Sequence, residues 1–233
     1  MRRLILFDID GTLLRTNGAA RRAFHRALLE VYGTAGPIAT HEFDGKTDPQ
    51  IAREILCAAG LTNGSVDRSL PQLWRAYLRE LAGELAQPGK SAEVLAGVVD
   101  LLDALEAYRG SAMVGLLTGN IRRGADLKLA AAGLGGRFAL GAYGSDDEDR
   151  SALPAVAVER ARELCGRRFS GSDIVIIGDT PSDVTCGRAL GVRSVAVATG
   201  RYNRTALREA GADVVLDDLS NTEASLAALL GTW

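Results

Sequence analysis

The sequence is poor in the residue types that define several classes of protein. It has three cysteines in 233 residues, and Cys57, Cys165 and Cys186 are far apart with no CxxC pair. This spacing argues against a disulfide framework and against a zinc site, and it indicates reduced thiols. The two histidines, His25 and His41, both fall in a helical segment away from the predicted sheet. Their position disfavours a hydrolase that uses a catalytic triad.

An excess of positive charge and long apolar runs are also absent. The 27 Lys and Arg against 29 Asp and Glu give a formal net charge of -2, so the chain has no overall positive field to attract nucleic acid or an anionic membrane. Near the start, acids interrupt the apolar residues too early for a signal peptide or a membrane span. We therefore expect a cytoplasmic protein. With 47% hydrophobic and 24% charged residues, the composition is that of a folded chain with a sizeable core.

Short apolar runs typical of buried parallel strands recur along the chain. Each of the later runs is followed by a helix-like segment, which is the alternation of a doubly wound, Rossmann-like α/β sheet. The runs are residues 4–8, Met113–Leu117, Ile174–Ile177, Ser194–Val197 and Val214–Leu216.

Only helical signals lie between the first and second of these runs. Asn17 is a candidate N-cap for a helix over 18–32, and Thr47 for a second helix with Pro49 in its first turn. A third helix is predicted along 70–85, where large apolar residues follow one face and indicate core packing.

The chain therefore divides into a sheet domain and a helical insertion. Gln87-Pro88-Gly89 ends the helical stretch, and the sheet domain resumes with a helix near Val94–Tyr108. We expect an α/β catalytic core of residues 1–14 and 89–233, and an all-helical cap of residues 15–88. Because two linkers would join them, the cap can move as a lid over the strand ends.

Two pairs of acids directly follow apolar strands. "LILFDIDGTL" carries Asp8 and Asp10, and "IVIIGDTPSDV" carries Asp179 and Asp183. Ligands of parallel sheets bind at the carboxyl ends of the strands, so the four acids are expected at one rim. Two like charges about 4 Å apart repel by about 4 kcal/mol at an effective dielectric of 20, so the cluster needs compensation. Mg²⁺ is the cation that such an oxygen-rich site favours.

A third strand end reads "VGLLTGN" before an apparent helix. Thr118 offers a hydroxyl there, and Gly119 and Asn120 offer backbone N–H groups at a helix N-terminus, which suits a phosphate. A phosphoryl group beside four acids also needs a cation from the protein. Arg150, in the loop "DDEDRSALP", is the candidate.

Together these segments resemble the haloacid dehalogenase superfamily of hydrolases, in its branch with a helical cap. DIDGT at 8–12 is similar to the first motif of that family, Thr118 to its second and GDTPSDV at 178–184 to its fourth. "FDGKTDPQIAREIL" and "GRALGVRSVAVATG" further resemble the phosphoglycolate-phosphatase-like members.

The resemblance implies a Mg²⁺-dependent phosphatase that acts on a small phosphorylated metabolite. Asp8 would attack phosphorus and form an aspartyl-phosphate, and Asp10 would act as general acid and then as general base. Asp8, the carbonyl oxygen of Asp10 and Asp179 would hold the metal, with Asp183 behind them.

The third motif of the family is normally a lysine, and this chain has none after Lys128. Arg150 is the expected substitute, because its guanidinium supplies charge and a bidentate contact. The roles of the cap residues His41 and Lys46 are left open.

Several other functions were weighed. A sugar-phosphate mutase of the same superfamily is disfavoured by Ala20 and Asp48, which stand near positions where such mutases carry a histidine and an arginine. A non-catalytic phosphate-ester sensor would not need a nucleophile. "DGKTD" departs from a P-loop at Thr40, and "GLGGRF" departs from a dinucleotide motif at Phe138. The leaving group, and whether the protein is a monomer or a homodimer, are left open.

Overall fold

The computed structural model describes residues 3–87 and 92–231, and it contains the expected parallel sheet. Six strands pair in the order β5-β4-β1-β6-β7-β8, and every pairing is parallel. The predicted doubly wound α/β fold is confirmed. The strands are β1 (Arg3–Phe7), β4 (Ala112–Thr118), β5 (Leu140–Tyr143), β6 (Ile174–Gly178), β7 (Arg193–Val197) and β8 (Val214–Leu216).

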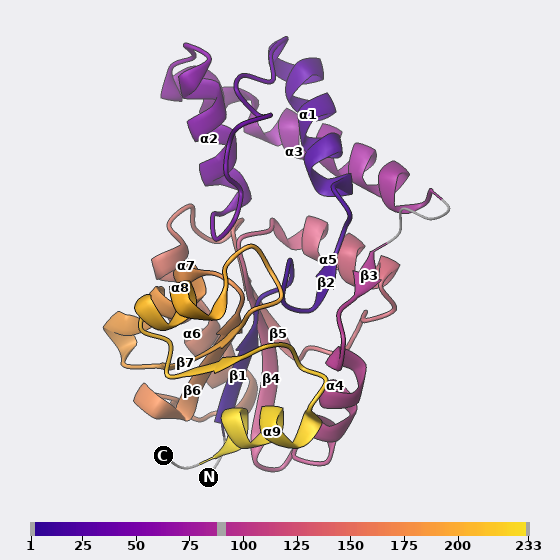
Figure 1. Cartoon of the computed structure of the whole chain (residues 1–233). Helices are drawn as coiled ribbons and strands as arrows, with labels where there is room; N and C mark the ends of the chain where they lie inside the picture. Colours follow the sequence, from indigo (N-terminus) through magenta and orange to yellow (C-terminus); the bar gives the residue numbers. More distant parts are fainter. Residues whose placement is uncertain (1–2, 88–91, 232–233) are drawn as a thin grey trace.

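Helices cover both faces of this sheet (Figure 1). Leu4 and Leu6 of β1 point to one face and pack in a cluster with residues of α6, whereas Ile5 and Phe7 point to the other face, towards α4 and α9. This alternation follows from the two-residue period of a strand. The helices are α4 (Val98–Glu106), α5 (Arg122–Ala131), α6 (Leu153–Cys165), α7 (Pro181–Thr185), α8 (Arg204–Glu209) and α9 (Thr222–Leu230), with short 3₁₀ turns at Arg150–Ala152, Gly171–Asp173 and Arg188–Leu190.

A helical unit lies over the carboxyl ends of the strands (Figure 1). It consists of α1 (Ala19–Tyr32), α2 (Asp48–Ala58) and α3 (Asn63–Leu85). Thr47 caps α2 through a hydrogen bond from Gln50 N–H, as expected. The apolar face predicted for the third helix packs against α1, where the rings of Tyr77 and Phe24 lie 5.1 Å apart.

Two details of this unit differ from expectation. Asn17 is not the N-cap of α1, because the chain enters the helix through a left-handed turn at Asn17 (φ 49°) and Gly18, and Gly18 takes the cap position without a side-chain bond. The third helix begins earlier than its apolar stripe, since Thr62 caps it ahead of the polar first turns.

The chain passes between sheet and helical unit through a short ribbon. β2 (Leu14–Arg15) and β3 (Glu93–Val94) pair antiparallel, with Leu14 opposite Val94. The proposed boundaries at 14/15 and 88/89 lie close to this ribbon, and the predicted Pro88-Gly89 break lies outside the described residues. The helix expected near Val94–Tyr108 is α4, which starts later because β3 uses its first residues. Strands β2 and β3 were not predicted, because runs of two residues carry little periodic signal. Strand β5 was not predicted either, because its sequence LGAY has a glycine within a short apolar run.

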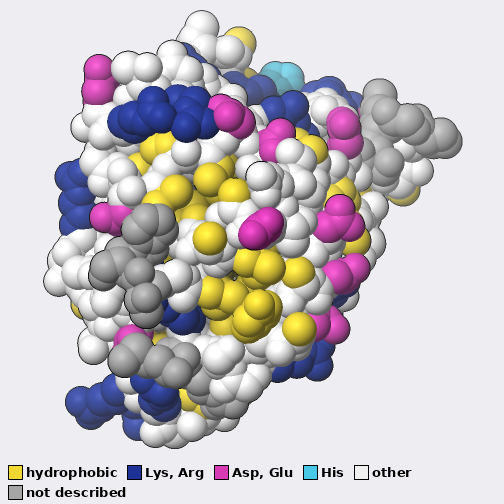
Figure 2. All heavy atoms as spheres, turned by 60° about the horizontal axis from the view of Figure 1, so that its bottom comes forward, with side chains coloured by type: hydrophobic (Ala, Val, Ile, Leu, Met, Phe, Trp, Pro, Cys, Tyr) yellow, Lys and Arg dark blue, Asp and Glu magenta, His cyan; other side chains and the backbone are white. Residues whose placement is uncertain are grey.

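The opposite end of the molecule has an apolar hollow. Figure 2 shows hydrophobic side chains gathered on the face seen from below, with charged side chains around them. A hollow of about 340 Å³ is lined there by Leu102, Leu105 and Phe138, with Glu106 and Arg137 among its lining residues. Within the described ranges, no helix has both the length and the hydropathy that crossing a membrane requires. The cluster of acids lies at the other end of the sheet.

Candidate active site

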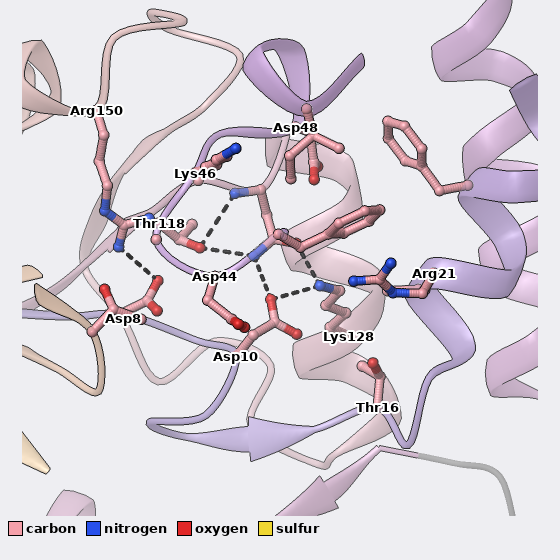
Figure 3. Close-up of a pocket in the computed structure, with 18 of the residues that line it drawn as sticks. Asp8, Asp10, Thr16, Arg21, Asp44, Lys46, Asp48, Thr118, Lys128 and Arg150 are labelled. Atoms are coloured by element: carbon pink, nitrogen blue, oxygen red, sulfur yellow. Dashed lines mark hydrogen bonds and ion pairs between the residues drawn. The ribbon is translucent and has the colours of Figure 1, made fainter. Parts of the chain in front are cut away.

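A cavity of about 230 Å³ lies between the strand ends and the helical unit. Asp8 comes from the end of β1, Thr118 from the end of β4 and Asp179 from the end of β6, and Phe24 and Tyr77 line the side of the helical unit. Figure 3 shows charged side chains of both parts pointing into this space. The carboxyl ends of the central strands therefore meet as predicted.

Asp8 is buried at the centre of the sheet end. Its N–H donates to the carbonyl oxygen of Ile177 at 2.9 Å, which continues the pairing of β1 with β6 for one residue. Burial raises the pKa of Asp8 to about 7; the positive charge of Arg150 opposes this shift, and Asp183 and Asp10 add to it. Asp8 is thus a carboxylate whose charge depends on its neighbours.

Two further acids lie beside Asp8. One oxygen from each of Asp8, Asp179 and Asp183 lies within 4.8 Å of the others, and all three residues are buried. Burial and the two other carboxylates raise the pKa of Asp179 well above its ordinary value. Gly11 turns the chain here with φ +80°, which glycine adopts without strain. A Cβ at this position would also lie 2.4 Å from Asp179 Oδ2, so glycine permits the close approach.

Asp183 has protein partners on both carboxylate oxygens. Its Oδ2 accepts from Thr180 N–H at 3.0 Å and from the Thr180 hydroxyl at 2.7 Å, in a capping box that starts α7. Its Oδ1 accepts from Arg150. These bonds fix Asp183 in place and leave it less free than Asp179 to bind a ligand directly.

Arg150 reaches the acids from the turn before α6. Its Nη2 lies 3.2 Å from Asp8 Oδ1 and also contacts Asp183, and the side chain is buried. Burial opposes the charge of the guanidinium, but Asp183 and Asp8 outweigh it and raise the pKa of Arg150. Among the residues that the structure describes, its buried Nε has no hydrogen-bond partner. The structure thus places Arg150 beside Asp8, as expected of the substitute for the family lysine.

In the Thr118–Asn120 turn, the N–H of Asn120 is arranged differently from the prediction. The hydroxyl oxygen of Thr118 accepts from Asn120 Nδ2 at 2.8 Å and from Asn120 N–H at 3.3 Å, so this N–H is not free for a phosphate. The next N–H, of Ile121, donates to Asp48 Oδ2 at 2.8 Å. The carboxylate of Asp48, from the helical unit, therefore occupies the N-terminus of α5, where a phosphate was expected.

Asp10 points to a different side of the cavity from Asp8. Its Oδ2 accepts from Lys128 Nζ at 2.6 Å and from Asn120 Nδ2 at 2.8 Å. Sequence reasoning did not select Lys128. A signal was present, because Ile121, Ala125 and Lys128 share the buried face of α5, and a lysine at an apolar position of a helix needs a partner.

The segment 45–48 closes the cavity from the side of the helical unit. Asp48 N–H donates to Gly119 O at 2.7 Å, and the Thr47 hydroxyl donates to Glu148 O at 2.7 Å. A Cβ on Gly119 would lie 2.0 Å from Lys46 O, so glycine permits this close approach.

Two of the other charged residues of the helical unit, Lys46 and Arg21, line the cavity. Lys46 lines the cavity and pairs with Glu54, and His41 Nε2 lies 3.1 Å from the same carboxylate. His25 is exposed on α1. Arg21 lines the cavity over the ring of Phe43, with its Nη2 donating to His41 O at 3.0 Å.

The acid cluster fits a hard divalent cation. Asp8, Asp179 and Asp183 present only oxygen donors, and burial and neighbouring carboxylates raise the pKa of Asp8 and of Asp179, whose ionised forms a cation would stabilise. Arg150 supplies one positive charge for three carboxylates, which leaves excess negative charge for a metal to neutralise.

Known proteins are similar to this chain in sequence and in fold. A phosphoglycolate phosphatase of Pseudomonas fluorescens (strain Pf0-1) is 29% identical over 229 residues, covering 93% of this chain and 77% of that protein. A crystal structure of a predicted phosphoglycolate phosphatase from Haemophilus somnus 129PT has a TM-score of 0.70 at 19% identity, covering 96% of this chain and 97% of that one. The structure of CbbY from Rhodobacter sphaeroides in complex with phosphate has a TM-score of 0.65 at 22% identity, with 99% of each chain covered.

The solved structures show the shared fold, since their identities are low. The family model described as "Haloacid dehalogenase-like hydrolase" matches residues 5–197, which contain the three strand ends, Arg150 and the whole helical unit. The chain therefore belongs to the haloacid dehalogenase-like hydrolases.

Proposed function

We propose that this hydrolase is a Mg²⁺-dependent phosphatase that cleaves a small phosphate monoester through an aspartyl-phosphate on Asp8. The observation that carries the proposal is the placement of Asp8, which is buried and lines the same cavity as Arg150, Thr118 and Asp179. A nucleophilic carboxylate, donors for phosphoryl oxygens and a metal-binding cluster then share one site.

The protein groups around Asp8 divide the work. The Asp8 carboxylate attacks phosphorus, and the ester oxygen leaves from the opposite side. The unpartnered Nε of Arg150 is a donor available to a phosphoryl oxygen. The Thr118 oxygen already accepts two hydrogen bonds from Asn120, so its own hydrogen is available to a second phosphoryl oxygen. Both donors are buried, where a charge-assisted hydrogen bond is strong.

Asp10 is assigned the proton transfers. It gives a proton to the leaving alkoxide and then takes one from the water that attacks the aspartyl-phosphate. Its side chain is 42% exposed towards the cavity, so it can reach substrate and water, unlike buried Asp8.

Asp8, the carbonyl oxygen of Asp10 and Asp179 would hold Mg²⁺, and Asp183 would support them from behind through its bonds to Thr180 and Arg150. When bound, the ion supplies positive charge that offsets the repulsion between the acids and the phosphoryl oxygens.

The cavity favours a small leaving group with a negative charge of its own. Its volume of about 230 Å³ is below the usual range for drug-sized ligands. Among the described cations that line it, Arg21 is the one without a carboxylate within 4 Å, whereas Lys46, Lys128 and Arg150 each pair with an acid. Phosphoglycolate, named for the curated relatives, is small and carries a carboxylate that Arg21 can bind.

A mutase receives less support from the same cavity. Asp48 turns its carboxylate to the N-terminus of α5, which repels a second phosphate at that helix end. Ala20 lines the cavity with a methyl group that offers no acid or base.

The test is release of p-nitrophenol or inorganic phosphate from p-nitrophenyl phosphate and phosphoglycolate, with Mg²⁺ and with EDTA. We expect turnover that requires the metal and is lost in Asp8→Asn. Asp103→Asn, a matched change at an exposed position of α4, should keep full activity. Tight binding of phosphate esters by the wild type without turnover would favour the sensor.

A further inference from the structure

Lys128 is a buried lysine whose ammonium group binds two acceptors beside the cavity. Its side chain is 4% exposed, whereas the Asp10 side chain with which it pairs is 42% exposed. Burying an ammonium group costs several kcal/mol unless acceptors surround it. Here Nζ donates to Asp10 Oδ2 and to Asn120 Oδ1, each at 2.6 Å.

Asn120 completes a closed hydrogen-bond network with these two residues. Because its Oδ1 accepts from Lys128, its Nδ2 faces the other way and donates to Asp10 Oδ2 and to Thr118 Oγ1, each at 2.8 Å. Lys128 thus sets the orientation of the Asn120 amide as well as binding Asp10 directly.

The network uses only one of the two oxygens of Asp10. Oδ2 accepts two strong hydrogen bonds, one of them from a cation. A proton is therefore disfavoured on Oδ2, and Oδ1 is the oxygen left to carry it. Helix α5 holds Lys128 in place through its packed neighbours Ala125 and Leu129, so the Asp10 carboxylate is fixed relative to the sheet.

A purely structural role explains these contacts less well. Apolar residues are enough to pack α5 against the sheet. An apolar residue at position 128 would avoid the desolvation free energy of a buried charge. Both acceptors of Lys128 line the cavity, and neither belongs to the packed core between α5 and the sheet.

We propose that Lys128 is a positioning residue that, together with Asn120, holds the Asp10 carboxylate by Oδ2 so that Oδ1 carries the transferred proton. The inference rests on the proposed function, because it assigns a role in general acid–base catalysis. As the bond from Asp8 to phosphorus forms and the ester bond breaks, the proton on Asp10 Oδ1 moves to the leaving oxygen. In the second step Oδ1 takes a proton from water as the water oxygen bonds to phosphorus and Asp8 is released.

The test compares two esters of similar size and charge that differ in their need for an acid. Phenyl phosphate has a poor leaving group that must be protonated, whereas p-nitrophenolate leaves without a proton. General acid catalysis contributes about 10²- to 10⁴-fold. The value of kcat/KM reports the step in which the ester bond breaks and leaves out the later hydrolysis of the aspartyl-phosphate, which both esters share. We therefore expect Lys128→Met to lower kcat/KM for phenyl phosphate by about 10²-fold and for p-nitrophenyl phosphate by less than about threefold.

Lys46→Met is the matched control, because it removes another cation that lines the cavity but pairs with Glu54. Any loss that it causes should be equal for the two esters. Binding of Mg²⁺, followed by calorimetry, should be the same in Lys128→Met and in the wild type.

Three results would overturn the inference: no loss of kcat/KM in Lys128→Met, an equal loss of kcat/KM with both esters, or lost Mg²⁺ binding. If that variant does not fold, Asn120→Ala takes its place, and it must show the same dependence on the leaving group for the inference to survive. If the wild type hydrolyses neither these esters nor phosphoglycolate, the proposed function itself fails.

Discussion

Asp48 offers a sharp test of how the helical unit is held on the sheet domain. It is buried, with 9% of its surface exposed, and its Oδ2 accepts from Ile121 N–H at 2.8 Å. Burial raises its pKa from 3.8 to about 6, and Lys128 and the bond from Ile121 limit the rise. Asp48→Asn keeps an oxygen acceptor for Ile121 and removes the charge.

The raised pKa of Asp48 predicts that Asp48→Asn stabilises the protein at neutral pH. Because the pKa of Asp48 is higher in the folded state, the folded protein binds more protons between about pH 4 and 6, and its free energy of unfolding falls as pH rises through this window. A difference of about 2 pKa units corresponds to about 3 kcal/mol. Asp48→Asn should therefore raise the free energy of unfolding by about 3 kcal/mol above pH 7 and by about half of that at pH 5.

The assay is urea denaturation of both proteins between pH 5 and pH 8 in EDTA, followed by circular dichroism. Other titrating groups are common to both proteins, so the difference between their unfolding free energies reports on Asp48. Asp103→Asn, at an exposed position of α4, is the control, and it should change stability by less than about 0.5 kcal/mol at every pH. A difference for Asp48→Asn that does not depend on pH, or that grows as pH falls, would refute the reasoning.

Three further predictions concern the cavity. Arg150→Met should lower kcat by at least about 10²-fold and Arg150→Lys by less, because the lysine keeps the charge beside Asp8; equal losses in steady-state kinetics would contradict this. Arg21→Gln should raise KM for phosphoglycolate about tenfold and leave KM for p-nitrophenyl phosphate nearly unchanged, since one charge-assisted bond is worth about 1.5–3 kcal/mol; a shared rise would show that Arg21 does not bind the carboxylate. Gly119→Ala should lower kcat/KM by at least about tenfold with the melting temperature of the sheet domain preserved, because its Cβ would meet Lys46 O at 2.0 Å; normal turnover would mean that segment 45–48 need not dock there.

The sequence predicted the site residues whose positions depend on the residues next to them in the chain. Asp8 and Asp179 could be placed at one rim, because each directly follows an apolar strand and parallel strands end at a common edge. Arg150 could be selected only as a charge in a nearby loop. Its contact with Asp8 depends on how the turn before α6 lies against β1, which loop length does not specify.

The tertiary structure decided which carboxylate oxygens bind which cationic side chains and backbone N–H groups. Lys128 contacts Asp10 because of the rotation of α5 on the sheet, and Asp48 reaches Ile121 because the helical unit rests on the Thr118–Asn120 turn. Such contacts join segments more than 70 residues apart, so no periodic pattern encodes them. Most strands of the sheet and the acids at their ends follow from local hydrophobic patterns. The order of the strands in the sheet was not predicted, and side chains from distant segments acquire their partners only when the packed elements fix their positions.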